Sequence, residues 1–523
     1  MRVGVGVMAL LGALVAGGAT EKVPQADGRR FVKSDIPRAC IPGGYGGERW
    51  KTYRERFEAE LATAKAGGAP VVFLGDSITH GGRYHEYLAD YYSTRFPEAT
   101  IRFVNSGIGG DTAPGAMPRI DEDVAEYGPS HVTFHFGMND IDRGAYGLES
   151  TDESLRARER AQAAYRANLP KLVKRVRQAA PKAKFVYLTP TPYEDTAVVT
   201  NAPKSGWASF NNVGCNAGLS LMAGYVLEKA AADKVEAVDW YSPLNAFRVR
   251  HQRENPYFSI TGPDRVHSAE LGHSIMAWVF LQRQGVPAVV SEVTVDAAKG
   301  QVVACENAAL SGLECKDGRI AFTLLAKALP FPVAPAALAY AREFKVEQTL
   351  NRETVTVKGL EPVTYVLTID GEEVAKATAA ELEAGLYLGF NAKTPQYRQA
   401  QAVARRHAEL WERERVLRNH HSARWFYRGR APVDDIPAFR AWYERDLKAG
   451  GAEAGSYFGQ FIPGYLEYWP RYREVREELW QDQLKVRELA KPVPHRYELL
   501  RMPLTSPFNP PPGLRDGRGE VER

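Results

Sequence analysis

Between about residues 30 and 290, short apolar segments alternate with longer segments of helical composition, and this alternation restricts the fold more than any other feature of the chain. The five apolar segments are rich in Val and Phe and end at Gly, Pro or polar residues; they are 71–76, 101–107, 131–137, 183–190 and 235–240. Such runs are typical of central strands that are buried on both faces. The segments 153–180 and 215–233 between them favour helix. Repeated strand–helix units predict a parallel sheet with helices on both sides.

Residues 291–394 have a different pattern. Apolar and polar residues alternate there, and the dipeptides Asp317-Gly318 and Asp370-Gly371 favour tight hairpin turns. This pattern predicts a small antiparallel β domain. The apolar, Pro-rich segment 328–341 within it is expected to pack against the α/β part.

Residues 395–490 are highly charged, and their pattern predicts a helical region. Apolar residues seven positions apart give it one apolar helix face: Val403, Leu410 and Leu417. The charged run 405–418 is interpreted as the solvated face of that helix. The last segment, 491–523, ends in Pro-rich, Gly-rich and charged sequence and is predicted to be a partly disordered tail.

The N-terminus combines one cation, Arg2, with an apolar run and small residues up to Ala19. This pattern is similar to a secretory signal peptide over residues 1–19, and an uncleaved N-terminal anchor is the alternative. Both interpretations predict export, to the periplasm or out of the cell. Since no other segment approaches the roughly 20 apolar residues of a membrane span, no span is expected after cleavage.

The composition indicates a globular chain of two or three domains. The 523 residues exceed one ordinary core, and 67 basic residues nearly balance 63 acidic ones, which gives no support for a nucleic acid partner. The 25 Tyr and nine Trp residues supply rings that stack on sugars or fill cores. Export permits disulfides. Cys305 and Cys315 flank a possible hairpin, but the connectivity of the four cysteines, with Cys40 and Cys215, stays open.

Four polar segments follow the predicted strands. They are LGDSIT around Ser77, NSGIGGDT at 105–112, FGMND at 136–140 and GPDRVHSAELGH at 262–273. The first three lie at or just after the carboxyl ends of strands, and the fourth follows the last strand by a loop. Because active residues gather at that edge of open parallel sheets, we expect the four segments to converge there.

These segments contain the groups that a nucleophilic serine requires. Ser77 needs a base, and His267 lies three residues after Asp264, so one turn supplies both the base and the carboxylate that orients it. The developing oxyanion needs donors, for which a backbone N–H at Gly110 and the amide of Asn139 are suited. The pattern predicts acyl transfer through Ser77.

Together the four segments resemble the motifs of the SGNH, or GDSL, family of serine esterases and acylhydrolases. The family's Gly-Asp-Ser, Gly-containing loop, Gly-x-Asn-Asp and Asp-x-x-His occur in the same order, at 75–77, 109–112, 137–140 and 264–267. The resemblance covers roughly residues 65–285. It implies a catalytic domain over 30–290 with the flavodoxin-like α/β/α sandwich. The elbow Gly-x-Ser-x-Gly of α/β-hydrolases is absent, because Thr79 stands at its second glycine.

The resemblance also implies a role for each residue. Ser77 is the nucleophile, His267 the base and Asp264 its orienting carboxylate. The N–H groups of Ser77 and Gly110 form the oxyanion hole with Asn139. The mechanism implies no cofactor and no metal.

Other polar residues have less specific interpretations. Serine at a strand-to-helix junction is also a good helix cap, and Asp76 and Asp111 are interpreted as carboxylates that organise loops. His80, three residues after Ser77, and Tyr193, in the segment 189–196 after a strand, are expected to contact substrate.

Three further histidines are given structural interpretations. His131 and His135 share one face of a strand, but no matched carboxylates accompany them, and no metal site is predicted. His273 is expected to be satisfied locally within a helix.

We therefore predict an exported serine esterase that hydrolyses small acyl esters, with an O-acetyl group on a carbohydrate as the favoured substrate. Export, abundant aromatic residues and the lack of a long apolar lid segment favour this substrate. The alternatives are a non-catalytic scaffold that binds glycan or protein, an acyltransferase with a sugar acceptor, and a lipid-type acylhydrolase. The acyl group and the oligomeric state stay open.

Overall fold

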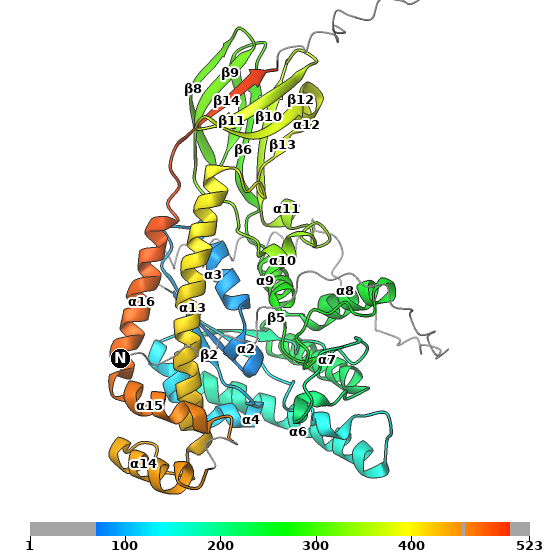
Figure 1. The fold of residues 1–523 in the computed structure, drawn as a ribbon, viewed down its shortest axis with the longest axis vertical. Helices are drawn as coiled ribbons and strands as arrows, with labels where there is room; N and C mark the ends of the chain where they lie inside the picture. The colour runs from blue at the N-terminus through cyan, green and yellow to red at the C-terminus, as the bar shows by residue number, and fades with distance from the viewer. Residues whose placement is uncertain (1–68, 452–455, 503–523) are drawn as a thin grey trace, which may run out of the picture. The chain divides into compact units, whose positions relative to one another are not determined.

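The computed structural model of the chain describes residues 69–451 and 456–502. The predicted signal peptide, 1–19, and the start of the predicted catalytic domain lie outside the described residues. Figure 1 shows an α/β part, a pair of further β sheets and a set of C-terminal helices.

Five parallel strands form the central sheet, in the order β2-β1-β3-β4-β5. They are β1 (Ala69–Gly75), β2 (Ile101–Gly107), β3 (His131–His135), β4 (Lys184–Leu188) and β5 (Glu236–Val238). Each coincides with one of the five apolar segments, so the predicted strands are confirmed. The strand order reverses between β1 and β3, which is where open α/β sheets form a crevice at their carboxyl edge. Ser77 follows β1 at this point.

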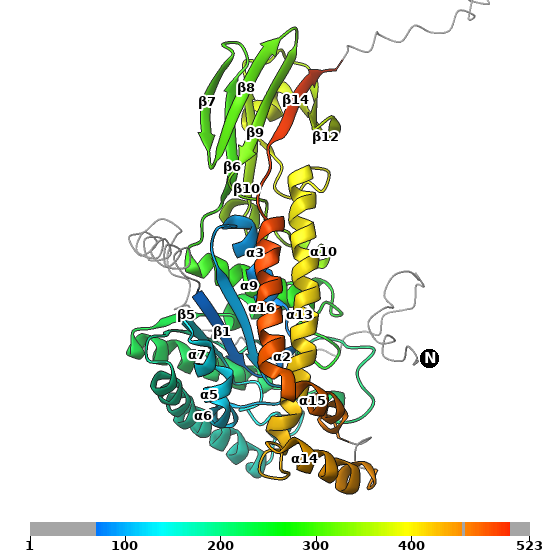
Figure 2. The same ribbon diagram turned by 90° about the vertical axis from the view of Figure 1, so that its left-hand side faces the viewer.

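Helices cover both faces of this sheet (Figures 1 and 2). α6 (Asp152–Ala179) packs with α7 (Cys215–Asp233) on one face, and α3 (Tyr84–Arg95) packs with α9 (Glu270–Gln284) on the other. The two long helices expected from the sequence are therefore confirmed, and with them the flavodoxin-like α/β/α sandwich. This part also contains the helices α2 (Ser77–Gly81), α4 (Ala113–Ala116), α5 (Ile120–Asp123) and α8 (Tyr241–Glu254).

Two further sheets follow, with strand orders β13-β10-β6-β7 and β12-β11-β14-β9-β8. The strands before the helical region are β6 (Val289–Asp296), β7 (Gln301–Glu306), β8 (Ala308–Lys316), β9 (Arg319–Ala326), β10 (Arg352–Lys358), β11 (Thr364–Ile369), β12 (Glu372–Thr378) and β13 (Leu386–Tyr387). Their pairs are antiparallel as predicted, except that β10 pairs with β6 in parallel. Asp317-Gly318 and Asp370-Gly371 form the expected tight turns, with positive φ at all four residues.

Segment 328–341 packs against the α/β part, as expected. Phe331, Val333 and Ala337 are buried in the same apolar core as the central sheet. The segment includes the short helix α10 (Pro335–Leu338), which contacts α9, and the short helix α11 (Val346–Thr349) comes after it. A last short helix of the β region, α12 (Ala379–Ala384), contacts β10.

The C-terminal tail contains a strand that the sequence pattern did not predict. β14 (His495–Arg501) lies between β11 and β9 and is antiparallel to both. Its residues Tyr497 and Leu499 are buried. Both neighbouring strands are more than 100 positions away in the sequence, so no hairpin turn next to this segment predicts the strand. The rest of the tail, 503–523, lies outside the described residues.

The two cysteines considered as a disulfide pair lie on different sheets. Cys305 is on β7 and Cys315 on β8, and both thiols are free, as is that of the buried Cys215. The chain changes sheets between β7 and β8 instead of closing a hairpin, so the two side chains do not share a ladder. Cys40 lies outside the described residues.

Four main helices form the C-terminal region: α13 (Pro395–Tyr427), α14 (Ile436–Trp442), α15 (Ile462–Tyr468) and α16 (Tyr472–Leu489). The predicted apolar face of α13 is confirmed, because Val403 and Leu410 form a buried cluster with residues of α16. The interpretation of 405–418 as a solvated face is wrong in part. His407 and Arg418 are buried, because α13 also packs along α3 and β2.

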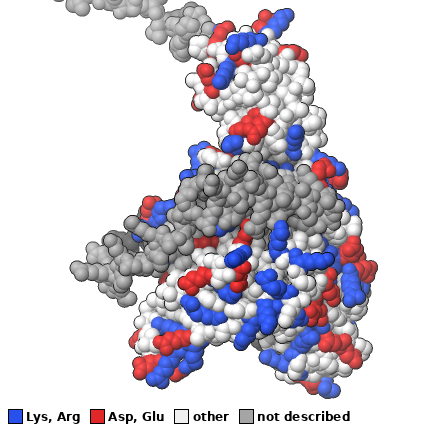
Figure 3. Space-filling model, turned by 180° about the vertical axis from the view of Figure 1, so that it is seen from behind, with Lys and Arg blue, Asp and Glu red and all other residues white. Residues whose placement is uncertain are grey.

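Charges of both signs are interspersed on the face shown in Figure 3, in keeping with the balanced composition. Among the described helices, none combines the length and the apolar character needed to cross a membrane.

Candidate active site

Ser77 is the first residue of α2, directly after β1. The preceding residue caps the helix: Asp76 Oδ1 accepts a hydrogen bond from the Ile78 N–H at 2.9 Å. The cap is therefore Asp76 and not Ser77, which confirms the loop-organising interpretation of Asp76. This leaves the Ser77 hydroxyl for other contacts, and the Ser77 N–H lies in the first turn, where a helix offers its N–H groups no acceptor.

His267 and Asp264 meet Ser77 at this edge of the sheet. Ser77 Oγ lies 2.8 Å from His267 Nε2, and His267 Nδ1 lies 2.6 Å from Asp264 Oδ2. Asp264 Oδ1 also accepts the backbone N–H groups of Val266 and His267 at 2.9 and 3.0 Å. Burial would raise the pKa of Asp264, but the hydrogen bonds from His267 and the neighbouring backbone outweigh it and lower the pKa. The lowered pKa favours the charged carboxylate of Asp264 beside the imidazole.

A loop after β4 holds the turn that carries this pair. Arg265 adopts a left-handed backbone conformation, with φ of 66°, which is unfavourable for a residue with a side chain. Its guanidinium donates to the carbonyls of Glu194 and Ala197 at 2.9 and 2.6 Å, and the Glu194 N–H donates to the Arg265 carbonyl at 3.0 Å. The segment 189–196, expected to line the cleft, therefore fixes the Asp264–His267 turn. Sequence reasoning missed Arg265, because nothing local indicates its partners.

The glycine loop after β2 provides one backbone donor. Gly110 has φ of 77°, and a Cβ there would meet no atom within 4 Å, so the backbone conformation and not crowding requires glycine. The Gly109 N–H donates to His80 Nδ1 at 3.2 Å and the Asp111 N–H to the Ile108 carbonyl at 3.2 Å. Within the described chain the Gly110 N–H has no acceptor, which leaves it available.

The Asn139 amide lies against the same loop. Its Nδ2 donates to the Asp111 carbonyl at 2.9 Å, and its Oδ1 accepts from Arg143 at 3.1 Å. These two bonds fix the orientation of the amide, whose second N–H remains for an oxyanion. Asp111 organises the loop as expected, because its carboxylate accepts the Thr112 N–H at 2.8 Å and binds Arg119.

Two carboxyls beside these donors are buried. Burial raises the pKa of both Asp76 and Asp140 to about 7. Asp140 Oδ1 accepts the Ala113 N–H at 3.0 Å, while its Oδ2 has no partner within the described chain. Both groups hold the loops around Ser77, through hydrogen bonds to backbone N–H groups.

The expected substrate contacts of His80 and Tyr193 do not fit their burial. His80 is 4% exposed, and burial together with Arg418 lowers its pKa to about 3, so it is a neutral acceptor behind the glycine loop. Tyr193 is 1% exposed, and its hydroxyl donates to the Phe210 carbonyl at 3.1 Å. A side chain that stands three residues after a nucleophile in a short helix points into the protein, which the sequence spacing does not reveal.

The remaining histidines also have structural surroundings. His135 Nδ1 lies 3.3 Å from Thr79 Oγ1, and burial lowers the pKa of His135 to about 3. His131 Nδ1 lies 3.0 Å from Ser130 Oγ. His273 is buried in α9, but its Nδ1 has no hydrogen-bond partner in the described chain, contrary to the expected local partner. No group of three or more potential metal ligands occurs among the described residues.

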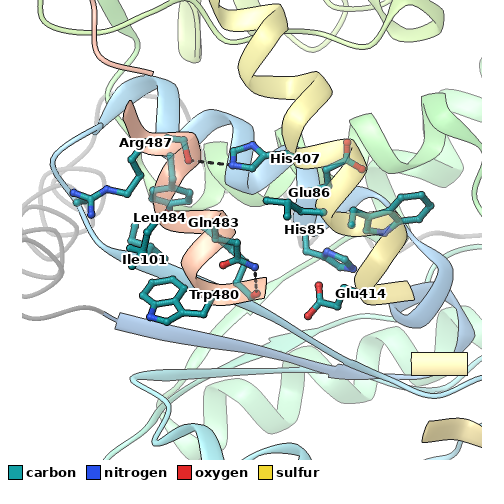
Figure 4. Close-up of a pocket in the computed structure, with 15 residues that line it drawn as sticks. His85, Glu86, Ile101, His407, Glu414, Trp480, Gln483, Leu484 and Arg487 are labelled. Atoms are coloured by element: carbon teal, nitrogen blue, oxygen red, sulfur yellow. Dashed lines mark hydrogen bonds between the residues drawn. The ribbon is translucent and has the colours of Figure 1, made fainter. Parts of the chain in front are cut away.

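A second Ser–His–Asp arrangement occurs between α3 and α13. His407 Nδ1 lies 2.6 Å from Asp90 Oδ1, and Ser93 Oγ lies 3.5 Å from His407 Nε2. Ser93 and His407 line a pocket between α3, α13 and α16, which Figure 4 shows with Glu414 and Trp480 beside it. Ser93 is inside α3, whose backbone N–H groups are used by the helix itself, whereas Ser77 begins α2, whose first N–H groups have no partner within the helix. The backbone N–H groups therefore distinguish Ser77 from Ser93.

Tyr457, in the C-terminal region, reaches the glycine loop. A Cβ on Gly109 would lie 3.9 Å from Tyr457 Cε1, and the Tyr457 side chain is 60% exposed. Sequence reasoning missed this residue, because it is about 350 positions away from the loop.

Comparison with known proteins gives a family for the α/β part. Residues 73–275 match the GDSL-like lipase/acylhydrolase family. Over 89 residues the chain is 34% identical to an acetylxylan esterase of Geobacillus stearothermophilus, a match to 14% of this chain and 41% of that protein. The chain thus spans less than half the length of this curated relative.

Solved structures are also similar. One, of a gut microbial diltiazem-metabolizing enzyme, matches 83% of this chain and 98% of its own with 29% identity and a TM-score of 0.72. Another, of the acetylxylan esterase Axe2 from Geobacillus stearothermophilus, matches 42% of this chain and 94% of its own with 24% identity and a TM-score of 0.32.

Proposed function

Residues 73–275 belong to the GDSL-like lipase/acylhydrolase family of ester-hydrolysing enzymes, and from this premise we propose that the chain is a serine esterase that uses Ser77, His267 and Asp264. One observation carries the proposal. The Ser77 hydroxyl is within 2.8 Å of an imidazole nitrogen whose other nitrogen is 2.6 Å from a carboxylate. Nucleophile, base and orienting group are therefore in hydrogen-bond reach of one another.

The reaction follows from this arrangement. His267 Nε2 takes the proton of Ser77 while Oγ attacks the ester carbonyl, and Asp264 stabilises the imidazolium that forms. The negative charge on the carbonyl oxygen is stabilised by the N–H groups of Ser77 and Gly110 and by Asn139. Collapse of the intermediate breaks the ester bond, and His267 returns its proton to the leaving alkoxide. Water, activated by the same histidine, then releases the acyl group from Ser77.

The favoured substrate is a small acyl ester on a carbohydrate, with acetyl as the acyl group. The acetylxylan esterase among the relatives supports this choice, as does the exposed Tyr457 ring beside Gly109, since aromatic rings pack well against apolar faces of ligands. The N-terminal sequence supports export to a compartment where glycans are accessible.

The experiment compares the purified wild type with Ser77→Ala and Ser93→Ala on p-nitrophenyl acetate and octanoate. Ser77→Ala is expected to lower kcat by at least about 10⁴-fold. Ser93→Ala is the matched control, because it removes the serine of the other Ser–His–Asp arrangement, and it should retain activity. Acetate release from acetylated xylo-oligosaccharides, with and without added sugar acceptor, then tests the substrate and separates hydrolysis from acyl transfer.

Equal activity of Ser77→Ala and wild type would contradict the proposal and favour Ser93 as the nucleophile. Faster hydrolysis of the octanoate than of the acetate would contradict the small-acyl substrate but leave the serine mechanism intact. Glycan binding without any ester cleavage would favour the scaffold alternative.

A further inference from the structure

Helix α13 brings two charged side chains, one helical turn apart, to the carboxyl end of β2. Glu414 Oε1 accepts the Asn105 N–H at 3.0 Å. Arg418 Nε donates to the Gly107 carbonyl at 3.2 Å. Asn105 Oδ1 in turn accepts the Gly107 N–H at 2.9 Å. The end of β2, from which the glycine loop departs, is thus held by the C-terminal region of the chain.

Arg418 also forms a buried ion pair. Its two terminal nitrogens donate to the two carboxylate oxygens of Asp123 at 3.0 and 2.9 Å. Asp123 is fully buried and binds a second guanidinium, that of Arg119, at 2.7 Å. Burial would raise the pKa of Asp123, but Arg418, His421 and Arg119 together lower it well below its usual range. One permanently charged carboxylate therefore fixes two arginines in place.

Arg119 extends this network to the other parts of the site. It donates to the carbonyls of Gly75 and Ser106 at 3.1 and 2.7 Å and to the Asp111 carboxylate at 2.9 Å. Gly75 precedes the Ser77 turn, and the Asp111 carbonyl accepts the Asn139 amide. The network thus contacts the nucleophile turn and the segments that carry both proposed oxyanion donors.

We propose that Arg418 is a positioning residue for the proposed esterase reaction, so that helix α13 is part of the active site. The inference rests on the proposed function. Arg418 binds Asp123, Gly107 and His421 and acts on the reaction through them, by keeping the Gly110 N–H and the Asn139 amide aligned with Ser77 Oγ. Oxyanion donors act on the transition state, and misplacement by about 1 Å can cost about 100-fold in rate. Loss of Arg418 should therefore lower kcat more than it raises KM.

Arg418→Lys and Arg424→Lys form a matched pair of variants. Arg424 lies on the same helix and is equally buried, and its guanidinium binds both oxygens of Glu122, the neighbour of Asp123, at 2.7 and 3.0 Å. Its hydrogen bonds reach Glu122 and Asp434 and no strand end. Both substitutions keep the charge and remove a two-point contact between α13 and α5. A role in stability alone predicts a lower melting temperature with an unchanged kcat per folded molecule for both.

The readouts are kcat and KM for p-nitrophenyl acetate, the rate of Ser77 labelling by a fluorophosphonate, and the melting temperature. Arg418→Lys is expected to lower kcat and the labelling rate by about 10- to 100-fold, with KM within about threefold. Arg424→Lys should stay within about threefold of wild type in both rates. If Arg418→Lys does not fold, Glu414→Leu tests the other anchor of β2 and should also lower kcat.

Equal kcat for Arg418→Lys and Arg424→Lys, with Ser77→Ala inactive, would overturn the positioning role and leave the esterase intact. For an unfolded Arg418→Lys, an unchanged kcat in Glu414→Leu would have the same meaning. Wild type no more active than Ser77→Ala would overturn the proposed function, and the inference with it.

Discussion

The two ends of helix α13 each meet a buried carboxyl group, in very different surroundings. At the N-terminal end, Gln396 Nε2 donates to Glu353 Oε1 of β10 at 2.8 Å, while Glu353 Oε2 has no partner within the described chain. Burial raises the pKa of Glu353 to about 7. At the C-terminal end, Asp123 is bound by Arg119 and Arg418, and its pKa is well below the usual range.

The two carboxyl groups therefore indicate different roles for the two halves of α13: one attaches the helix to the β region, and the other positions the strand ends beside Ser77. A carboxyl group that is readily protonated near neutral pH, such as Glu353, is one hydrogen-bonding group among others and joins α13 to the β region. A carboxylate that stays charged at every working pH holds guanidinium groups in short, directed bonds. The C-terminal half of α13 therefore transmits a fixed geometry to the strand ends beside Ser77, and its N-terminal half is expected to contribute only to stability.

Of the substitutions considered at the contacts of α13, Asp123→Asn should change the free energy of unfolding most. It leaves two buried guanidinium groups without their shared anion, which is expected to lower the free energy of unfolding by about 3–5 kcal/mol. Because the folded-state pKa is depressed, the wild-type contribution is present above about pH 4 and is lost as the pH falls below it. Denaturant titrations of both proteins at pH 7 and pH 3 measure this difference. A loss under 1 kcal/mol at pH 7 would mean that the network is not strongly coupled.

Glu353→Gln should raise the free energy of unfolding at high pH, whereas Asp123→Asn lowers it. The folded-state pKa of about 7 exceeds the ordinary value of about 4.3, so the wild type loses stability as the pH rises between these values. Glutamine does not titrate, so the variant has no buried charge at high pH. It is expected to be more stable than wild type by up to about 3 kcal/mol at pH 8 and equal to it near pH 4. Urea titrations at both pH values test this, and kcat should not change. A variant that is less stable than wild type at pH 8 would show that neighbouring groups stabilise the charged form of Glu353.

Thr394→Ala should have the smallest effect. Thr394 Oγ1 caps α13 by accepting the Tyr397 N–H at 3.3 Å, and loss of such a cap costs about 1 kcal/mol. Because this end of the helix meets the β region, kcat per folded molecule should remain that of wild type. A marked fall in kcat with little loss of stability would contradict the division between the two ends.

The sequence alone predicts the five central strands, the two long helices that cover one face and the segments that meet at Ser77. The strands are recognisable because each is an apolar run bounded by turn residues, and Asp264 and His267 because their contact is made within one turn. The cap role of Asp76 is predictable for the same reason, since its partner is two residues away. Interactions at short range in the sequence leave a local pattern.

Contacts between distant segments leave no such pattern. The strand β14 pairs with β9 and β11 far away in the chain, and Arg418 appears in the sequence as one charge in a run that resembles a solvated face. The burial of His80 is equally hidden in the sequence. Its position near Ser77 suggests a substrate contact, but the fold buries the side chain.

The α/β/α sandwich and the polar segments at its carboxyl edge follow from the amino-acid sequence, because backbone periodicity and turn chemistry act over a few residues. The charges of α13 that are buried, and the groups that they bind, depend on tertiary packing. A charged side chain is exposed or paired according to the surface on which its helix packs, and that surface belongs to a part of the chain some 300 residues away.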